Sequence, residues 1–315
     1  MWKKVLNFYG RFTVSFTGLG FVLRGLPFRP LGGSFKGQTW LVTGATGGIG
    51  KAIALGAAKR GAKVFAAGRN EAALKALEAE GGPNIVAMCF DLEKVSDNLA
   101  LAEAMAKRVE RVDVLVNNVG KLEHVYKTSA EGFESTYALN VLGHYALTER
   151  LIEKGALNGA VIINMASGGL YNSALSVRRL EQKPEKYSGV MAYAAHKRAQ
   201  LALSDLWTAG SHRISAYTMH PGWVRTEGVR TALPGLNKNL GPILRSTAQG
   251  ADTALWLAAR RPKPVPGALW FDRKPRSAHA YDHTKTPEVE PEAVFAKLKA
   301  DVAKVTGAAE VAQLA

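Results

Sequence analysis

The chain has 315 residues, of which 47% are hydrophobic, so it can bury the core of one large α/β domain or of two small ones. Lys and Arg number 41 and Asp and Glu 26, and the resulting charge of +15 indicates either an anionic partner or simply a soluble, charged surface. No short run is dense enough in basic residues for a nucleic-acid arm, so we expect no nucleic-acid partner. Cys89 is the only cysteine, which excludes an intrachain disulfide and favours a reducing compartment. Its apolar neighbours predict a buried packing residue rather than a nucleophile.

Residues 1–37 form a basic and apolar extension that contains no acidic residue. Its longest uncharged piece, residues 12–23, is too short to span a bilayer, and no small-residue cleavage site follows. Two interpretations remain open: an amphipathic segment that lies on an anionic membrane or near a lipid-like substrate, and a segment packed over the domain. We therefore expect a cytoplasmic protein, peripheral to a membrane under the first interpretation. The basic residues are Lys3, Lys4, Arg11, Arg24, Arg29 and Lys36.

The first regular unit combines a short apolar strand ending at residues 40–42, a glycine-rich turn and a helix. This order predicts the first unit of a dinucleotide-binding sheet. Glycines permit the tight turn and a close approach of the backbone to a pyrophosphate, and the helix N-terminus offers N–H groups and partial positive charge. A turn without a ligand is the alternative for such a motif on its own. The turn and helix start contain Gly44, Thr46, Gly47, Gly48, Ile49 and Gly50.

Arg69 follows the second predicted strand, residues 63–67, at the point where NAD-binding units place an acid on the ribose 2′-hydroxyl. An arginine there can accept a 2′-phosphate, so the sequence favours NADP(H) over NAD(H). A solvated loop arginine is the alternative interpretation.

The remaining elements alternate between strand and helix, which predicts one domain with a doubly wound, parallel, Rossmann-like sheet of about seven strands and helices on both faces. We divide the chain into residues 1–37, a domain of residues 38–275, and a C-terminal loop and helix over residues 276–315. We expect residues 223–246 to be irregular. The further predicted strands are 85–90, 112–116, 160–165, 214–219 and 268–271, and the helices are 70–80, 95–109, 136–154, 193–207, 247–259 and one from about residue 292.

Polar residues follow several predicted strands, at the edge where parallel sheets bind ligands. Tyr193 and Lys197 are four residues apart, so they share one face of a helix, and a nearby cation lowers the pKa of a tyrosine and makes it a better proton carrier. Ser167 could hold a substrate oxygen beside the Tyr193 hydroxyl. A surface pair is the alternative for the Tyr-x-x-x-Lys spacing alone.

Taken together, these motifs resemble the short-chain dehydrogenase/reductase family over roughly residues 38–271. The resemblance rests on residues 43–50, 117–120 and 221–226, and on a catalytic tetrad in the family's order. Five further segments, residues 165–169, 192–198, 219–223, 248–253 and 272–275, are similar to one subgroup whose substrate is poorly defined. The tetrad positions are Asn140, Ser167, Tyr193 and Lys197.

The resemblance implies an NADP(H)-dependent oxidoreductase that interconverts a carbonyl and an alcohol. Tyr193 would be the acid/base, Lys197 would lower its pKa and bind the nicotinamide ribose, Ser167 would orient the carbonyl, and Asn140 would hold a relay water. No metal is implied. The implied cofactor contacts are Gly44, Thr46, Gly47, Gly48, Ile49, Gly50, Arg69, Asp91, Leu92, Asn118, Val119, Gly120, Tyr193, Lys197, Pro221, Gly222, Val224 and Thr226.

Two features depart from the family pattern. Ser167 and Tyr193 are 193 − 167 = 26 residues apart, which is about twice the gap that is usual in the family. Retinol-dehydrogenase-like members have a similar long insertion. We expect the inserted residues to border the substrate site. His196 replaces the common serine, and we expect it on the helix surface.

The substrate and assembly are less constrained by the sequence. Apolar residues between 223 and 244 suit a small, apolar or lipid-like carbonyl substrate, but they would equally suit lid packing. The family often forms homodimers through the helices predicted at 136–154 and 193–207, and the sequence leaves this open. The rival function is a non-catalytic NADP(H)-binding sensor or a membrane-associated scaffold on the same fold.

Overall fold

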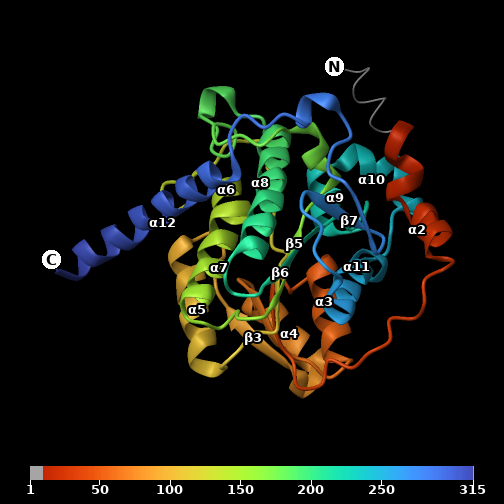
Figure 1. The fold of residues 1–315 in the computed structure, drawn as a ribbon, viewed down its shortest axis with the longest axis horizontal. Coiled ribbons are helices and arrows are strands. Elements are labelled where there is room, and N and C mark those ends of the chain that lie inside the picture. The colour runs from red at the N-terminus through yellow and green to blue at the C-terminus, as the bar shows by residue number, and fades with distance from the viewer. Residues whose placement is uncertain (1–9, 315) are drawn as a thin grey trace.

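A single eight-stranded sheet forms the centre of the computed structural model, which describes residues 10–314 (Figure 1). The strand order is β3-β2-β1-β4-β5-β6-β7-β8, and every pair is parallel except β7 with β8. The order reverses between β1 and β4, which is where doubly wound sheets bind their ligands. The strands are β1 Thr39–Thr43, β2 Lys63–Gly68, β3 Ile85–Cys89, β4 Val114–Asn117, β5 Val161–Met165, β6 Ser215–Met219, β7 Ala268–Phe271 and β8 Lys274–Ser277.

Helices cover both faces of the sheet, as predicted (Figure 1). On one face α3, α4 and α11 pack on β-strand side chains, and on the other face α5, α7 and α8 do so. Each parallel crossover contains at least one helix, which is the arrangement expected for a parallel sheet buried on both sides. The helix bounds are α3 Gly48–Ala58, α4 Glu71–Gly81, α5 Val95–Arg108, α7 Gly143–Glu153, α8 Gly189–Ala209 and α11 Thr247–Arg260.

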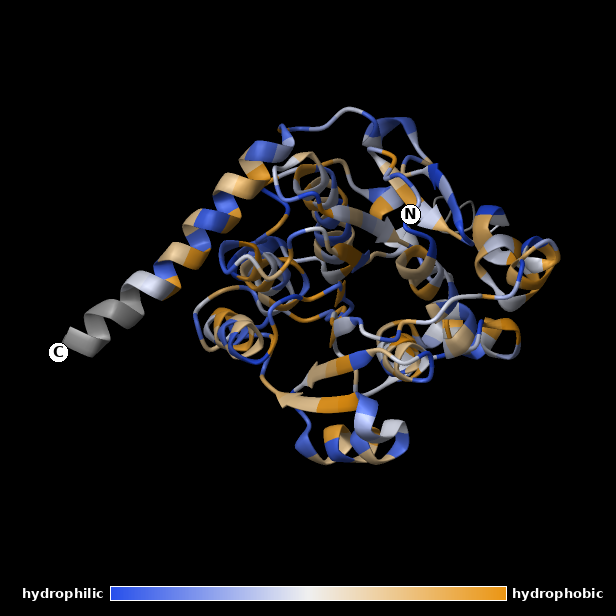
Figure 2. Ribbon diagram, turned by 60° about the horizontal axis from the view of Figure 1, so that its bottom comes forward, coloured by the Kyte–Doolittle hydropathy of each residue, from blue (hydrophilic) through white to orange (hydrophobic). Residues whose placement is uncertain are grey.

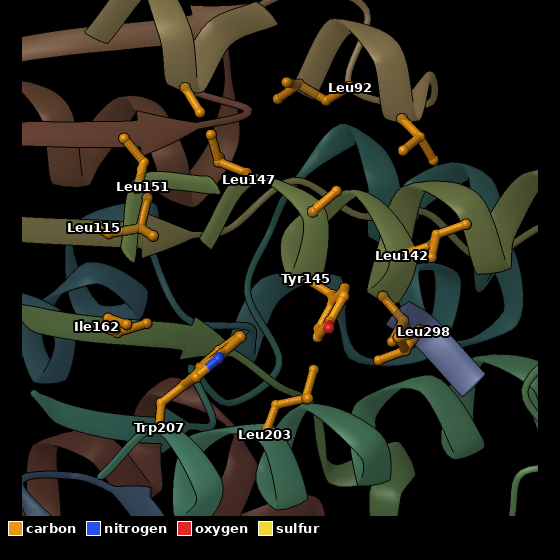
Figure 3. Close-up of a cluster of buried hydrophobic side chains, with 14 of the residues drawn as sticks. Leu92, Leu115, Leu142, Tyr145, Leu147, Leu151, Ile162, Leu203, Trp207 and Leu298 are labelled. Atoms are coloured by element: carbon orange, nitrogen blue, oxygen red, sulfur yellow. The ribbon is translucent and has the colours of Figure 1, made fainter. Parts of the chain in front are cut away.

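The side chains of β1 to β6 alternate between the two cores, and these strands are hydrophobic along most of their length (Figure 2). Leu41 of β1 faces the core beneath α5, α7 and α8, whereas its neighbour Val42 faces the core beneath α3 and α11. Leu115 and Ile162 share the first core with Tyr145 and Leu203 (Figure 3). The continuous apolar runs of the sequence therefore predicted the buried strands correctly.

The predicted helix over 136–154 is interrupted near its start. The short helix α6, Ser135–Tyr137, leads into a π-helical segment, Ala138–Leu142, before α7 begins. Single π turns inside helices are frequent at functional sites because they change the direction of a side chain. Asn140 lies in this segment and is completely buried.

The expectation of an irregular stretch over residues 223–246 is wrong, because two short helices occupy it. The Oγ1 atom of Thr226 accepts a hydrogen bond of 3.2 Å from the Val229 N–H and caps α9, Glu227–Ala232. Pro234 begins α10, Pro234–Leu240, at a position where its missing N–H leaves no helical bond unmade.

The eighth strand was also not predicted. All four residues of β8 are exposed, and the two-residue turn before it places Asp272 and Arg273 at positive φ angles of 49° and 58°. Such turns usually contain Asn or Gly. Here Arg245 and Asp252 form ion pairs with the two turn residues, and these contacts offset the backbone strain.

The N-terminal segment packs against the domain from residue 10 onwards; Lys3 and Lys4 lie outside the described residues. Residues 10–16 and α2, Gly18–Gly25, are helical, and Phe16 is buried among Leu170, Leu201 and Phe271. The packed-segment interpretation therefore holds for this part. The opposite face is apolar and exposed, however, and contains Val14, Leu19, Val22, Leu23 and Leu26. Within residues 10–314, no helix is both long and apolar enough to cross a bilayer.

The C-terminal helix α12, Pro291–Leu314, lies against α7 and α8 (Figure 1). Phe295 meets Tyr145 edge-on with ring centroids 5.0 Å apart, and Asp301 accepts a hydrogen bond of 2.8 Å from the Tyr137 hydroxyl. Part of the helical surface that the family resemblance implicates in dimers is thus covered by the chain itself.

Two predictions for single residues are wrong. Cys89 is exposed, because it is the last residue of the edge strand β3, beyond the cover of α4. His196 is completely buried instead of lying on the helix surface, because the inserted residues before α8 fold over it; its Nε2 atom lies 2.7 Å from the Leu180 carbonyl oxygen.

Candidate active site

The glycine-rich turn between β1 and α3 has the shape of a phosphate cradle. Gly44 has a φ of +64°, and a Cβ atom on Gly50 would lie 2.3 Å from the Gly44 oxygen, so neither position accepts a larger residue without a shift. Gly47 precedes α3 in an extended conformation, and no side chain caps the helix. The first N–H groups of α3 therefore remain available to an anion, with the helix dipole behind them. Thr46 and Ile49 are partly exposed in the same turn.

The end of β4 holds this turn in place. The Asn118 amide nitrogen donates hydrogen bonds of 2.8 Å to the Thr43 oxygen and 3.2 Å to the Gly44 oxygen. The Thr43 hydroxyl in turn accepts the N–H groups of Asn118 and Val119. Asn118 thus shapes the turn directly, which is a structural role that the sequence did not reveal. Gly120 comes next, and a Cβ atom there would lie 3.5 Å from the Lys197 ammonium.

Arg69 is exposed immediately after β2 and forms no ion pair with any residue in the described part of the chain. On the neighbouring strand end, Asp91 is partly buried, and its Oδ1 atom accepts the Glu93 N–H at 3.3 Å. Leu92 is buried at the same edge. The carboxyl ends of β2 and β3 therefore present the exposed Arg69 guanidinium beside a loop with carboxylates, and its charge helps to lower the pKa of Glu93.

Three of the four tetrad residues meet beyond β5. Ser167 follows β5 and accepts the Gly169 N–H at 3.2 Å, and a Cβ atom on Gly169 would lie 3.5 Å from the Tyr193 ring. Lys197 lies one turn further along α8, with its Nζ atom 5.4 Å from the centre of that ring. The Lys197 ammonium donates to the Met165 carbonyl oxygen at 2.8 Å. The predicted sharing of one helix face by Tyr193 and Lys197 is thus present.

Asn140 approaches from the other side, through its π-helical segment. Its Oδ1 atom accepts the Lys121 N–H at 2.9 Å, and its Nδ2 atom donates to the Lys121 oxygen at 2.8 Å. The same nitrogen lies 3.3 Å from Nδ1 of His196. The side chain of Asn140 is therefore fixed by the protein, and its backbone carbonyl accepts from Gln200 of α8 at 2.7 Å.

Burial dominates the electrostatics of this corner. It lowers the pKa of Lys197 to about 7 and that of His196 to about 4. It also raises the pKa of Tyr193 to about 12, although a hydrogen bond from Ser167 partly opposes the shift. The pKa of Tyr193 therefore moves opposite to our expectation, because burial of its hydroxyl outweighs the hydrogen bond with Ser167.

The loop after β6 closes the site against the glycine turn. Gly222 has a φ of +81° after Pro221, and Val224 is buried against Gly250 of α11. The methyl group of Thr226 lies 3.2 Å from where a Cβ atom on Gly48 would be. Two motifs that are separated by more than 170 residues in the sequence thus touch.

Sequence reasoning missed several buried polar residues around the tetrad. Gln200 is completely buried and contacts Asn140, Lys197 and His144. Its place one turn after Lys197 was the only signal in the sequence. Arg245, also completely buried, donates to the Pro221 oxygen at 3.3 Å and so supports the loop after β6.

A model of the short chain dehydrogenase family matches residues 38–236 of the chain, which is more than half of its length. The chain belongs to the short-chain dehydrogenase/reductase family. It is therefore an NAD(P)-dependent oxidoreductase with a Rossmann-like fold, and the resemblance read from its motifs is confirmed.

Known relatives support this assignment. The chain is 38% identical to human dehydrogenase/reductase SDR family member 12 over 254 residues, which cover 77% of this chain and 79% of the relative. That protein belongs to the subgroup that the five sequence segments resemble. Human retinol dehydrogenase 13 is 31% identical over 295 residues, covering 88% of this chain and 87% of the relative. The crystal structure of 3-ketoacyl-(acyl-carrier-protein) reductase from Brucella melitensis, complexed with NADH, superposes with a TM-score of 0.60 at 26% identity, over 75% of this chain and 96% of that chain.

Proposed function

We propose that this family member uses NADP(H) to interconvert a carbonyl and an alcohol on a small, apolar or lipid-like substrate. The observation that carries the proposal is the convergence of Ser167, Tyr193 and Lys197 beyond β5, within reach of Gly120 and the glycine turn. A substrate oxygen between the Ser167 and Tyr193 hydroxyls would meet one group that orients it and one that carries a proton.

The chain fits the cofactor that this chemistry needs. A Cβ atom on Gly47 would meet open space beside the turn, and the start of α3 has no side-chain cap. When bound, the nicotinamide supplies or accepts the hydride. We propose that the turn residues 44–50 hold the pyrophosphate, Asp91 and Leu92 the adenine, residues 118–120 the ribose side, and Pro221, Gly222, Val224 and Thr226 the carboxamide.

The preference for NADP(H) rests on Arg69. Its guanidinium is exposed after β2 without an ion pair in the described residues, and no acid occupies this strand end. A free arginine can form a bidentate contact with a 2′-phosphate, whereas an acid would repel it.

Tyr193 would give its proton to the developing alkoxide during reduction and take it back during oxidation. Its pKa of about 12 in the dry, unliganded site favours the protonated phenol, which is the form that reduction requires. Oxidation needs the phenolate, and a positively charged nicotinamide beside the ring would favour that form.

The substrate class is inferred from the walls of the site. Residues 168–192 run past Tyr193, and the His124 side chain of the loop after β4 reaches the Ala232 oxygen of α9 at 2.8 Å. Trp223 after β6 and Val229 of α9 are partly exposed. These groups would surround an apolar molecule and leave its carbonyl at Tyr193.

We also propose that the exposed face of α2 contacts an anionic membrane peripherally. Leu19 and Leu23 are more than half exposed, and Arg29 and Lys36 follow on exposed positions. An apolar face flanked by cations is the pattern of helices that lie in the membrane interface. The test is flotation of the full chain with vesicles of phosphatidylcholine, with and without phosphatidylserine. We expect binding that needs phosphatidylserine and is lost in Leu19→Ser/Leu23→Ser; equal flotation of that variant would refute the contact.

The test of the catalytic proposal is a screen of apolar aldehydes and ketones for NADPH oxidation, with Tyr193→Phe as the key variant. We expect Tyr193→Phe to lose at least about 1000-fold in turnover while NADPH still binds, because the proton donor is gone and the cradle is intact. Tyr281→Phe, outside the site, is the matched control. Ordinary turnover by Tyr193→Phe would contradict the proposal, and NADPH binding without turnover by the wild type would favour the sensor or scaffold function.

A further inference from the structure

Residues 10–26, which we call the N-terminal strap, lie outside the stretch that the family model matches, yet they contact the loop after β6 directly. The Trp223 N–H donates to the Phe16 backbone oxygen at 2.8 Å, and the Trp223 oxygen accepts from the Arg245 N–H at 2.8 Å. The Arg225 N–H then donates to the Arg245 oxygen at 2.9 Å. Backbone hydrogen bonds thus join the strap, the loop after β6 and residue 245 into one unit.

The buried guanidinium of Arg245 connects the same segments a second time. Its Nε atom donates to the Phe16 oxygen at 3.1 Å, and its Nη2 atom donates to the Ser15 oxygen at 3.1 Å. Its Nη1 atom donates to the Pro221 oxygen at 3.3 Å. A Cβ atom on Gly222 would lie 2.2 Å from the Arg245 Nε atom, so the guanidinium packs directly against the backbone of Gly222. One side chain therefore fixes backbone oxygens of the strap and of the loop at once.

The residue before Pro221 is held by packing instead. His220 is buried, and neither of its ring nitrogens has a hydrogen-bond partner within residues 10–314. Its ring meets Phe16 edge-on with centroids 4.4 Å apart and stacks on Phe271 at 5.1 Å. Burial and the nearby Arg245 keep the pKa of His220 well below its ordinary value, so the ring is neutral at pH 7. The position of His220 therefore depends on aromatic contacts, of which the strap supplies one.

The start of the loop after β6 has little of its own to fix its conformation. Pro221 has no N–H to donate, and Gly222 adopts a φ of +81°, where glycine gives up more conformational freedom than any other residue. These two residues are also among those that we propose hold the carboxamide of the cofactor. Contacts from outside the loop therefore decide where this part of the cofactor site lies.

We propose that Arg245 and the N-terminal strap position the nicotinamide end of the cofactor site by holding Pro221 and Gly222. They leave the adenosine end unaffected: Arg69 follows β2, and β1, β4 and β5 lie between β2 and β6 in the sheet. At the usual spacing of neighbouring strands, those two strand ends are roughly 19 Å apart. The inference deepens the proposed function and rests on it for the identity of the cofactor.

The first experiment compares two ligands by calorimetry: NADPH, and adenosine 2′,5′-bisphosphate, which lacks the nicotinamide. Arg245→Lys keeps the positive charge beside Asp272 but loses the fork of donors. We expect its affinity for NADPH to fall at least about tenfold. Its affinity for the bisphosphate should stay within about twofold, because distant sites act independently. Equal losses for both ligands, or no loss for either, would overturn the proposal.

The control is Arg108→Lys, the same substitution at an exposed residue of α5, which should bind both ligands as the wild type does. Phe16→Leu is a second test that leaves Arg245 intact. It keeps an apolar side chain but removes the aromatic contact with His220, so NADPH should bind about three- to tenfold more weakly and the bisphosphate normally. Wild-type NADPH affinity in Phe16→Leu would refute the role of the strap. Calorimetry reports any unfolded fraction as a lower stoichiometry, separately from the affinity.

The last experiment uses the wild type alone, because coupling between two parts of a molecule is reciprocal. If the strap strengthens NADPH binding, NADPH must in turn stabilise the strap. Hydrogen exchange is measured with each ligand at the same multiple of its Kd, so that global stabilisation is equal. We expect NADPH to slow exchange in residues 12–24 at least about threefold more than the bisphosphate does. Equal protection by the two ligands would contradict the coupling.

The failure of this inference is distinguishable from the failure of the proposed function. NADPH binding without turnover of any carbonyl compound would refute the proposed function, while selective losses in the two variants would still support the positioning role. Failure of the wild type to bind NADPH would refute both.

Discussion

Replacing Asp272 by Asn tests the buried charge cluster that joins the N-terminal segment to the loop after β6. Asp272 has no exposed side-chain surface and accepts from Arg245 at 2.6 and 3.0 Å and from Arg24 at 2.7 Å. Arg245 also donates to the backbone oxygens of Ser15, Phe16 and Pro221. One carboxylate thus balances two guanidinium groups, one of them completely buried.

Asparagine is the appropriate substitution because it nearly matches aspartate in shape and tolerates the positive φ of this position. It removes the negative charge and turns an NH₂ group towards donors. Removing one partner of a buried ion pair leaves the other charge uncompensated, which costs about 3–5 kcal/mol. We expect the free energy of unfolding to fall by about that amount.

The assay is urea denaturation followed by circular dichroism at neutral pH, with the free energy taken by linear extrapolation. The control is Asp282→Asn, because Asp282 is 94% exposed in its pair with Lys285 and should leave the midpoint unchanged. If the free energy of unfolding of Asp272→Asn fell by less than about 1 kcal/mol, the Asp272 carboxylate would not be compensating the buried Arg245 guanidinium as the structure indicates.

Three further outcomes follow from the site and its surroundings. Gly50→Ala should weaken NADPH binding at least about tenfold in a fluorescence titration, because the new Cβ atom would collide with the Gly44 oxygen. Gly235→Ala is the control: a Cβ atom there meets open space, so this variant should bind NADPH normally. Burial lowers the pKa of Lys197 to about 7, so between pH 7 and about pH 10 the unfolded chain binds one more proton at Lys197 than the folded chain does. The free energy of unfolding should therefore rise with pH over this window. In urea denaturation, the Lys197→Met variant should lack that rise. Light scattering should find the full chain monomeric, because α12 covers part of α7 and α8. The molar mass of a truncated chain that ends before Pro291 is the comparison. A dimer of the full chain would contradict this expectation.

The sequence predicted those parts of the molecule whose signals are local. The apolar runs located seven strands, and the glycine turn and the Tyr193–Lys197 spacing located the candidate site. Each of these depends on residues close together in the chain, such as one strand, one turn or one face of a helix. The start of β4 was placed two residues early, which is within the usual uncertainty of element ends.

The features that sequence reasoning missed depend on distant partners. The turn before β8 has Asp272 and Arg273 at positive φ, where arginine is unusual, and it is held by Arg245 and Asp252 from elsewhere in the chain. His196 was expected on the surface because the inserted segment that buries it has no periodic pattern. Burial itself reversed the expected direction of the Tyr193 pKa, and burial is a property of the packed molecule.

The measurement that tests the proposed function most directly is a titration of the purified chain with NADPH and NADH, followed by nicotinamide fluorescence, for the wild type and Arg69→Ala. We expect the wild type to bind NADPH more tightly than NADH, and the NADPH affinity of Arg69→Ala to fall towards the NADH value, because the exposed guanidinium would lose its contact with the 2′-phosphate. Equal affinities for the two nucleotides in the wild type would contradict the NADP(H) preference. Failure to bind either nucleotide would contradict the cofactor site itself.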